Sequence, residues 1–378
     1  MTKQEIGEIK KLFKMNSCSI DRVTGCYVDG EKNIRATFMQ PLLSMPEEEI
    51  FKYLEILKKS LSGSLEKNLH TIEFSLDAEQ AGGQQNELLK LRDSKLKNPD
   101  ALLAYYQRII DSYEYVGNYL ILVFHDAYDV PGKAKDGETM TDASDEVYEY
   151  ILTCICPVEL AKPGLYYNEN EGKFENLNRP RMVGAPDAAF LFPAFNDRCS
   201  DIHSILCYEK KPEEKKDSLM EAVIGKIMPL TAGEQKETFN ALIEETLGEN
   251  CDMEIVKSIH EKLTEKIENH KEESEPLMLG KEDIKSVFAD SGVSNDKMMA
   301  FDEHYEQTVG NVELAAENVV NAKALEVKSP DVVIKVSPDR TDLLDTAVVN
   351  GRRCLVIEMG SNVLVNGVQI QERLEGEA

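Results

Sequence analysis

The sequence contains no apolar run of about 18 residues, the length that a membrane-spanning helix needs. Its longest apolar runs, such as "YLILVF", have the length of a β-strand. The N-terminal stretch Met1–Asn16 also lacks a continuous apolar core and instead places Ile6, Ile9 and Leu12 at helical spacing. This pattern predicts an amphipathic helix rather than a signal peptide. We therefore expect a cytoplasmic protein that does not enter a membrane.

A disulfide framework is absent as well, because the eight cysteines are scattered along 378 residues. This distribution predicts reduced thiols that serve mainly in packing. Cys154 and Cys156 alternate within "YILTCICPV", so a strand would turn both side chains to the same sheet face. Two thiolates could bind a metal, but no C-x-x-C motif or histidine cluster supplies further ligands. We favour two small residues on a buried face and predict no metal.

Positive charge is scarce: 43 Lys and Arg residues stand against 69 Asp and Glu residues, and the formal net charge is −26. Such a charge repels phosphate backbones and anionic lipid surfaces. Nucleic acid is thus a disfavoured partner, and association with the translation machinery would need a local basic patch. The acidity indicates a solubilising surface or, alternatively, a face suited to a basic protein partner.

Common catalytic motifs are missing too. The sequence has neither of the glycine-rich phosphate loops, G-x-x-x-x-G-K-[ST] and G-x-G-x-x-G, and we predict no cofactor. It also lacks the zinc-protease motif H-E-x-x-H and the nucleophile elbow G-x-S-x-G. These absences favour a protein without enzymatic activity, although they leave that question open.

What the sequence does contain is a change of pattern along the chain. Strand and helix patterns mix without strict βαβ alternation at first, which predicts an α+β fold. The predicted organisation is a mixed α+β domain at 1–211, a helical segment at 212–275, a helix pair at 276–321, a small C-terminal β-rich unit at 322–370 and a frayed tail at 371–378.

Local signals predict where several elements begin and turn. Ser44 with Glu47, and Thr231 with Glu234, have the spacing of capping boxes that start helices. The dipeptides Asp29-Gly30, Asn350-Gly351 and Asn366-Gly367 predict hairpin turns between β-prone runs. The nearly continuous apolar run "NYLILVFHDAYDVP" predicts a central strand that is covered on both faces.

The corner "PAFNDRCSDIH" is the densest polar group in the sequence, with Asn196, Asp197, Arg198, Asp201 and His203. In an extended segment Asp201 and His203 share a face, so the carboxylate could orient the ring as a general base. The alternative is structural: Asn196 and Asp197 form a turn, and Arg198 pairs with a carboxylate to fix a strand connection. We favour the structural alternative.

A second polar group follows the predicted central strand. Carboxylates at the end of a buried strand are well placed to bind a cation or act as a base, but the spacing here matches no calcium loop. A solvated acidic loop is the favoured interpretation. The members of this group are His125, Asp126, Asp129, Asp136, Asp142 and Asp145.

Several long blocks resemble one bacterial family of Firmicutes type, domain of unknown function number four-three-one-seven. The blocks include "FLFPAFNDRCSDIHSILCYEKKPEE", "SPDVVIKVSPDRTDLLDT", "GRRCLVIE" and "VLVNGVQI", and the resemblance spans nearly the whole chain. It implies a cytoplasmic bacterial protein, and the family supplies no assigned activity, cofactor or catalytic residue.

Two functional hypotheses follow. The leading one is a non-enzymatic regulatory factor that binds another protein through its C-terminal helix pair and β-rich unit. The alternative is a hydrolase or transferase of unusual type, whose site would join His125, Asp126 and Asp129 to the corner with Asp197, Arg198, Asp201 and His203. This alternative requires the two segments to converge on one reacting centre. The sequence does not determine the oligomeric state.

Overall fold

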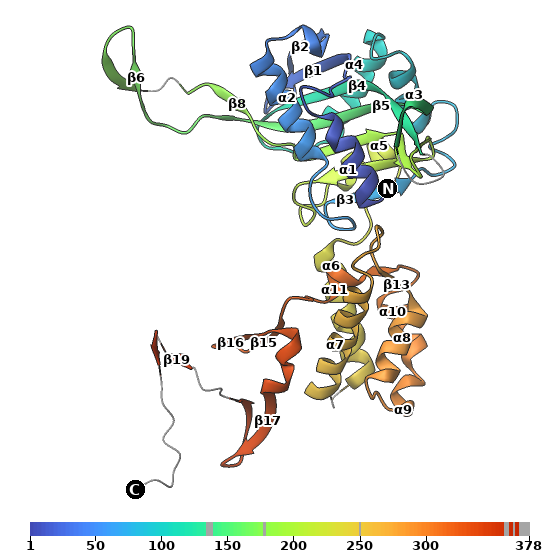
Figure 1. Cartoon of the computed structure of the whole chain (residues 1–378), viewed down its shortest axis with the longest axis vertical. Coiled ribbons are helices and arrows are strands. Elements are labelled where there is room, and N and C mark those ends of the chain that lie inside the picture. Colours follow the sequence, from blue (N-terminus) through green and yellow to red (C-terminus); the bar gives the residue numbers. More distant parts are fainter. Residues whose placement is uncertain (134–138, 177–178, 249–250, 359–362, 366, 370–378) are drawn as a thin grey trace. The chain divides into compact units, whose positions relative to one another are not determined.

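The computed structural model describes residues 1–133, 139–176, 179–248, 251–358, 363–365 and 367–369. Contacts divide the chain into two compact units, which are termed unit 1 (Met1–Glu234 with Ser274–Pro276) and unit 2 (Gln235–Glu273 with Leu277–Ala378). Both units contain helices and antiparallel strands, which confirms the predicted α+β class (Figure 1). The finer division into four segments and a tail stays a prediction.

A large antiparallel sheet forms the centre of unit 1. Its strands follow the order β2-β1-β4-β5-β9-β12-β3, and β8 pairs with β5 beside this path. Strand β4 lies between β1 and β5, so the predicted central strand is confirmed. The strand bounds are β1 Arg22–Val28, β2 Ile34–Gln40, β3 Leu69–Glu73, β4 Asn118–Lys133, β5 Thr139–Leu160, β8 Arg181–Val183, β9 Ala188–Phe192 and β12 Ser204–Glu209.

Helices cover both faces of this sheet, and the alternation of β4 shows why its sequence is apolar throughout. Ile121 and Val123 belong to a core that includes residues of α3 (Gln84–Asp93), α4 (Pro99–Ser112) and α5 (Asp217–Ile224). Leu122 and Phe124 point the other way, into a core shared with α1 (Lys3–Leu12) and α2 (Glu47–Ser60). Because successive strand residues face opposite sides, a strand covered twice needs apolar residues at every position.

One predicted capping box is present and the other is not. At the start of α6 (Ala232–Leu247) the amide of Glu234 donates to Oγ1 of Thr231, and the amide of Thr231 donates to the Glu234 carboxylate. The predicted box of Ser44 with Glu47 is wrong. Ser44 ends a short 3-10 turn, and its hydroxyl donates to the carbonyl of Pro41, so Pro46 occupies the cap position of α2 without a side-chain cap.

The predicted hairpins connect the expected strands. Asp29 accepts the amides of Glu31 and Asn33 and so holds the turn between β1 and β2. Asn350 and Gly351 take φ values of 53° and 75°, the left-handed pair that a two-residue hairpin turn requires. They join β17 (Leu344–Val349) to β18 (Arg352–Ile357). Gly367, with φ 83°, lies between the paired strands β19 (Leu364–Val365) and β20 (Val368–Gln369).

Unit 2 combines a helical core with the C-terminal ribbons. Phe239, Phe288 and Phe301 are fully buried, and Phe288 contacts each of the other two rings edge to face, which gives the helices a common aromatic centre. No described helix is long and apolar enough to cross a membrane. The remaining bounds are α7 Met253–Asn269, β13 Met278–Leu279, α8 Lys281–Asp290, α9 Asn295–Met298, α10 Phe301–Thr308, β14 Leu314–Ala315, α11 Ala316–Val319, β15 Leu325–Lys328, β16 Val333–Val336 and the 3-10 helix η3 Pro338–Leu343.

Candidate functional site

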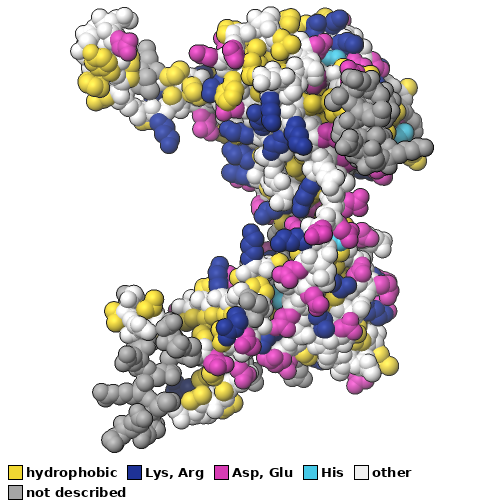
Figure 2. Space-filling model, in the orientation of Figure 1, with side chains coloured by type: hydrophobic (Ala, Val, Ile, Leu, Met, Phe, Trp, Pro, Cys, Tyr) yellow, Lys and Arg dark blue, Asp and Glu magenta, His cyan; other side chains and the backbone are white. Residues whose placement is uncertain are grey.

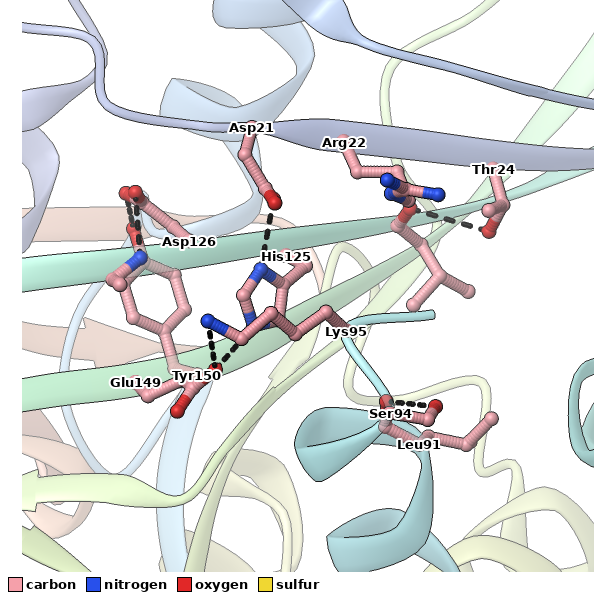
Figure 3. A network of polar contacts seen from close by, with 12 residues as sticks. Asp21, Arg22, Thr24, Leu91, Ser94, Lys95, His125, Asp126, Glu149 and Tyr150 are labelled. Atoms are coloured by element: carbon pink, nitrogen blue, oxygen red, sulfur yellow. Dashed lines mark hydrogen bonds and ion pairs between the residues drawn. The ribbon is translucent and has the colours of Figure 1, made fainter. Parts of the chain in front are cut away.

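His125 is the centre of a polar network in unit 1 (Figure 3). Its ring is almost completely buried on β4, with Nδ1 2.8 Å from Oδ1 of Asp21 and Nε2 2.9 Å from Oε1 of Glu149. Asp21 directly precedes β1, and Glu149 lies on β5, so the ring links the two neighbours of its own strand. Lys95 approaches the same Glu149 oxygen at 3.5 Å.

Each ring nitrogen of His125 lies within hydrogen-bond distance of a carboxylate, so both have a partner inside the fold. The network therefore links the start of β1 to β4 and β5, which gives the ring a structural role.

Asp126 is separated from His125 by the sheet itself. Its carboxylate accepts the hydroxyl of Tyr150 at 2.7 Å and the amide of Ala127 at 2.9 Å, on the side of the α1 and α2 core. The residue is fully buried, and this burial raises the pKa of the carboxyl. Neighbouring strand residues face opposite sides, so His125 and Asp126 cannot act on one atom. Asp129, further along β4, is exposed to solvent.

The polar corner is a tight hairpin between β10 (Ala194–Asn196) and β11 (Cys199–Asp201). Asp197 and Arg198 form its two-residue turn, with φ values of 52° and 58°. Arg198 donates from Nη2 to Oε1 of Glu8 at 2.9 Å, from Nε to Oε2 at 3.0 Å, and from Nη2 to the carbonyl of Pro131 at 3.0 Å. These contacts match the structural alternative, in which an arginine fixes the strand connection.

Asp201 and His203 do not form the side-chain pair that an extended segment would allow. The Asp201 carboxylate accepts the amide group of Asn196 at 2.6 Å and the backbone amide of His203 at 3.0 Å. The His203 ring instead lies with Nδ1 2.8 Å from Oε1 of Glu79, and this carboxylate raises the pKa of the exposed ring. A turn at Ile202 breaks the alternation on which the pairing depended.

The predicted residues thus form separate local networks. Arg198 reaches the end of β4 at Pro131, but His125, Asp126 and His203 each have different partners on different elements. Asp136 lies outside the described residues, as do the side chains of Asp142 and Asp145. No group of three or more His, Cys, Asp or Glu side chains in the described part could hold a metal ion. Cys154 and Cys156 share a buried face, and burial raises the pKa of both thiols.

A polar cavity of about 490 Å³ in unit 1 was not predicted from the sequence. On its wall Lys216 places Nζ 3.5 Å from Oδ2 of Asp187 and 3.9 Å from Oε1 of buried Glu209, and Tyr113 donates to the same Asp187 oxygen at 2.7 Å. Burial raises the pKa of Glu209 to about 7, against the opposing effect of Lys216. Tyr113 and Asp187 are distant in the sequence from each other and from the segment that contains Glu209 and Lys216. The one feature of the sequence that could have indicated this cavity is the carboxylate of Glu209, which ends the otherwise apolar strand "SILCYE".

Apolar side chains are exposed on the β-ribbons at the C-terminal end of unit 2. The ribbons β15–β16, β17–β18 and β19–β20 each contain two strands, and none has a third strand within the described residues. Figure 2 shows hydrophobic side chains gathered there. Exposed members are Val332, Val333, Val348, Val349, Val356, Ile357, Leu364, Val365 and Val368.

Unit 1 also has an exposed two-stranded ribbon (Figure 1). Strands β6 (Leu165–Asn168) and β7 (Lys173–Asn176) pair only with each other in the described part of the chain. Tyr167 and Phe174 contact each other across this ribbon at 5.2 Å between ring centroids, and both remain more than half exposed.

The fold and these contacts define a two-unit α+β protein with buried polar networks in unit 1 and uncovered apolar ribbons in unit 2. A comparison with protein families then shows to which family the chain belongs. The family described as Domain of unknown function (DUF4317) matches residues 1–368, so the chain belongs to this family, as the resemblance predicted. Among curated proteins, none matches the chain.

Proposed function

We propose that this protein is a non-enzymatic regulatory factor of the bacterial cytoplasm, which binds another protein through the ribbons β15–β20. One observation carries the proposal: β-branched and leucine side chains on these ribbons are exposed, several of them at consecutive positions such as Val348 and Val349, so that both faces of a ribbon present apolar surface. Val348 is 73% exposed, Leu364 63% and Val368 69%. Exposed apolar patches of this kind mark surfaces that become buried on association.

The backbone of the ribbons supports the same proposal. A two-stranded ribbon is marginally stable alone, and each of its outer edges carries unpaired amide and carbonyl groups. An added strand from a partner would satisfy these groups and cover alternate apolar side chains at the same time. The partner chemistry that fits is an extended segment, or an open sheet edge, with apolar residues at every second position.

The polar networks of unit 1 favour binding over the alternative of an unusual hydrolase or transferase. Arg198 forms an ion pair with Glu8, and both ring nitrogens of His125 contact carboxylates. The His203 ring pairs with Glu79 at the surface. Each side chain has a role within the fold that accounts for its position. Such contacts support the structural interpretation of both polar groups.

The test compares full-length proteins that are tagged and produced in their native cells. The wild-type chain should yield a partner at constant stoichiometry after cross-linking, with cross-links that map to the ribbons β15–β20. The double variant Val333→Lys/Val348→Lys should lose this partner while its circular dichroism stays unchanged, because both side chains are exposed. Val116→Lys, at a fully exposed valine of unit 1, is the matched control and should keep the partner.

Two results would contradict the proposal. One is the repeated absence of any stoichiometric partner of the wild-type chain. The other is a partner that the double variant retains, since such a partner would bind elsewhere.

A further inference from the structure

Unit 2 contains a groove of about 520 Å³ between helices α6 and α7, the end of α11 and strand β15. Helix α7 contributes Val256, His260 and Thr264, which recur at helical spacing and face the groove. Its core face is made by Ile259 and Leu263, which are fully buried. The side of α7 that faces the groove therefore mixes apolar and polar side chains, in contrast to its apolar core side. A groove of this size is typical of small-molecule sites.

The groove combines apolar side chains with charged ones, among which three lysines (Lys236, Lys257 and Lys328) stand against two carboxylates (Glu261 and Glu326). Val256, Val320 and Val327 provide apolar surface. Lys236 enters from α6, and Lys328 enters from β15. Lysines on different elements thus meet around one apolar surface, in a chain whose formal net charge is −26.

The carboxylates near the groove already have partners. Glu261 accepts the hydroxyl of Thr341, and Glu326 lies 2.9 Å from Nζ of Lys335. No carboxylate of the described residues forms an ion pair with Lys236 or Lys328. The two lysines thus lie at the groove without a direct ion-pair partner among the described residues, and Glu326 is the lining carboxylate that their charges reach.

Two neighbouring groups respond to this positive charge. The pKa of His260 is lowered first by burial and then by the charge of Lys236. The pKa of the Glu326 carboxyl is lowered by Lys335, and Lys328 and Lys236 act in the same direction. The site therefore favours an anion over a cation or a neutral headgroup.

We infer that this groove binds a small apolar carboxylate, with the hydrocarbon part on the valines and the carboxylate between Lys236 and Lys328. The apolar body gains free energy by leaving water, and the charged contact to lysine selects the headgroup. A bound ligand would bridge α6 and α7 to β15. The inference concerns a different surface from the partner-binding ribbons and does not depend on the proposed function.

The test is calorimetric titration of the full-length chain with decanoate, decanol and decyltrimethylammonium, which share one chain length and differ in headgroup. Decanoate should bind with one site per chain. Decanol should bind at least tenfold more weakly, and the cationic amphiphile should not bind. Raising the salt concentration should weaken decanoate binding, because solvent ions screen the lysines.

Variants locate the site. Lys236→Gln/Lys328→Gln should weaken decanoate binding at least tenfold and leave circular dichroism unchanged. Lys266→Gln, at an exposed position of α7 that is not among the residues lining the groove, is the control and should bind decanoate like the wild type. The inference fails if decanoate does not bind, if decanol binds as tightly as decanoate, or if the double variant binds decanoate like the wild type.

Discussion

The guanidinium of Arg198 and the carboxylate of Glu8 form a two-point ion pair, with Nη2 2.9 Å from Oε1 and Nε 3.0 Å from Oε2. The two side chains are only 20% and 26% exposed, so the pair is better shielded from solvent than an ordinary surface pair. It connects the β10–β11 turn to helix α1. Glu8 also accepts the hydroxyl of Tyr128 at 2.9 Å, which extends the link to β4.

Removal of this pair should destabilise unit 1. Arg198→Ala breaks both charge-assisted hydrogen bonds and the contact to the Pro131 carbonyl, and we expect a loss of about 1 to 3 kcal/mol in unfolding free energy. Arg198→Lys keeps the charge but not the forked geometry and should lose about half as much. Urea denaturation monitored by circular dichroism measures both changes.

The control for this prediction is Arg35→Ala. Arg35 also pairs with a carboxylate, at 2.6 Å from Asp29, but its side chain is 62% exposed. A solvated pair contributes little, so we expect a change below about 0.5 kcal/mol. Equal effects of Arg35→Ala and Arg198→Ala would show that burial of the Arg198 pair has no special role.

The His125 network should also contribute to the stability of unit 1. His125→Ala removes a buried ring and two hydrogen bonds, and we expect the unfolding free energy to fall by about 2 to 4 kcal/mol. Asp21→Asn should have a smaller effect, because the Asp21 side chain is 47% exposed. The double variant should cost less than the sum of the two single variants, since both remove the same contact. Additive effects in this cycle would contradict a coupled Asp21–His125 pair.

The parts of the fold that were predictable depend on short-range patterns. The apolar run of β4 and the turn at Asn350-Gly351 specify their conformation within a few residues. The capping box of Ser44 failed although it is local, because Ser44 ends the 3-10 turn Leu42–Ser44 and α2 begins only at Glu47, after the cap residue Pro46. A motif of two residues does not reveal at which residue the helix will begin.

The polar networks were not predictable for a different reason. His125 meets Asp21 across 104 residues of sequence, and this contact depends on the register between β1 and β4. Because side chains alternate along a strand, Asp126 points away from His125 although the two are adjacent in the sequence. A cluster of polar residues in the sequence does not show this separation. The cavity beside Lys216 and Glu209 needs four elements to meet, so no linear motif marks it.

Glu209 should make stability depend on pH. Its pKa rises from the ordinary 4.5 to about 7 on folding, so the native state binds the proton more tightly than the unfolded chain. Stability is then highest when the carboxyl is neutral in both states and falls as pH rises from about 4.5 to about 7. The burial of the ionised form can cost up to about 3 kcal/mol above that range.

Glu209→Gln tests this dependence because the amide stays neutral at every pH. Relative to the wild type, the variant should gain stability between pH 5 and pH 8 by up to about 3 kcal/mol, as measured by urea denaturation at each pH. Glu159→Gln, at an exposed residue on the rim of the same cavity, should follow the wild-type curve. Parallel curves for the wild type and Glu209→Gln would contradict the raised pKa.

Gly25 and Phe38 face each other across β1 and β2, and the aromatic ring occupies the space that a side chain at position 25 would need. A Cβ atom at Gly25 would lie 2.2 Å from Cε1 of Phe38. Gly25→Ala should therefore displace the ring and lower the unfolding free energy by about 1 to 3 kcal/mol.

Phe38→Ala should also destabilise the protein, because the ring packs against the core on the α1 and α2 side. In the double variant the new methyl group has room, so the combined loss should be at least about 1 kcal/mol smaller than the sum. Additivity within about 0.5 kcal/mol would mean that the ring moves away from Gly25 at no cost.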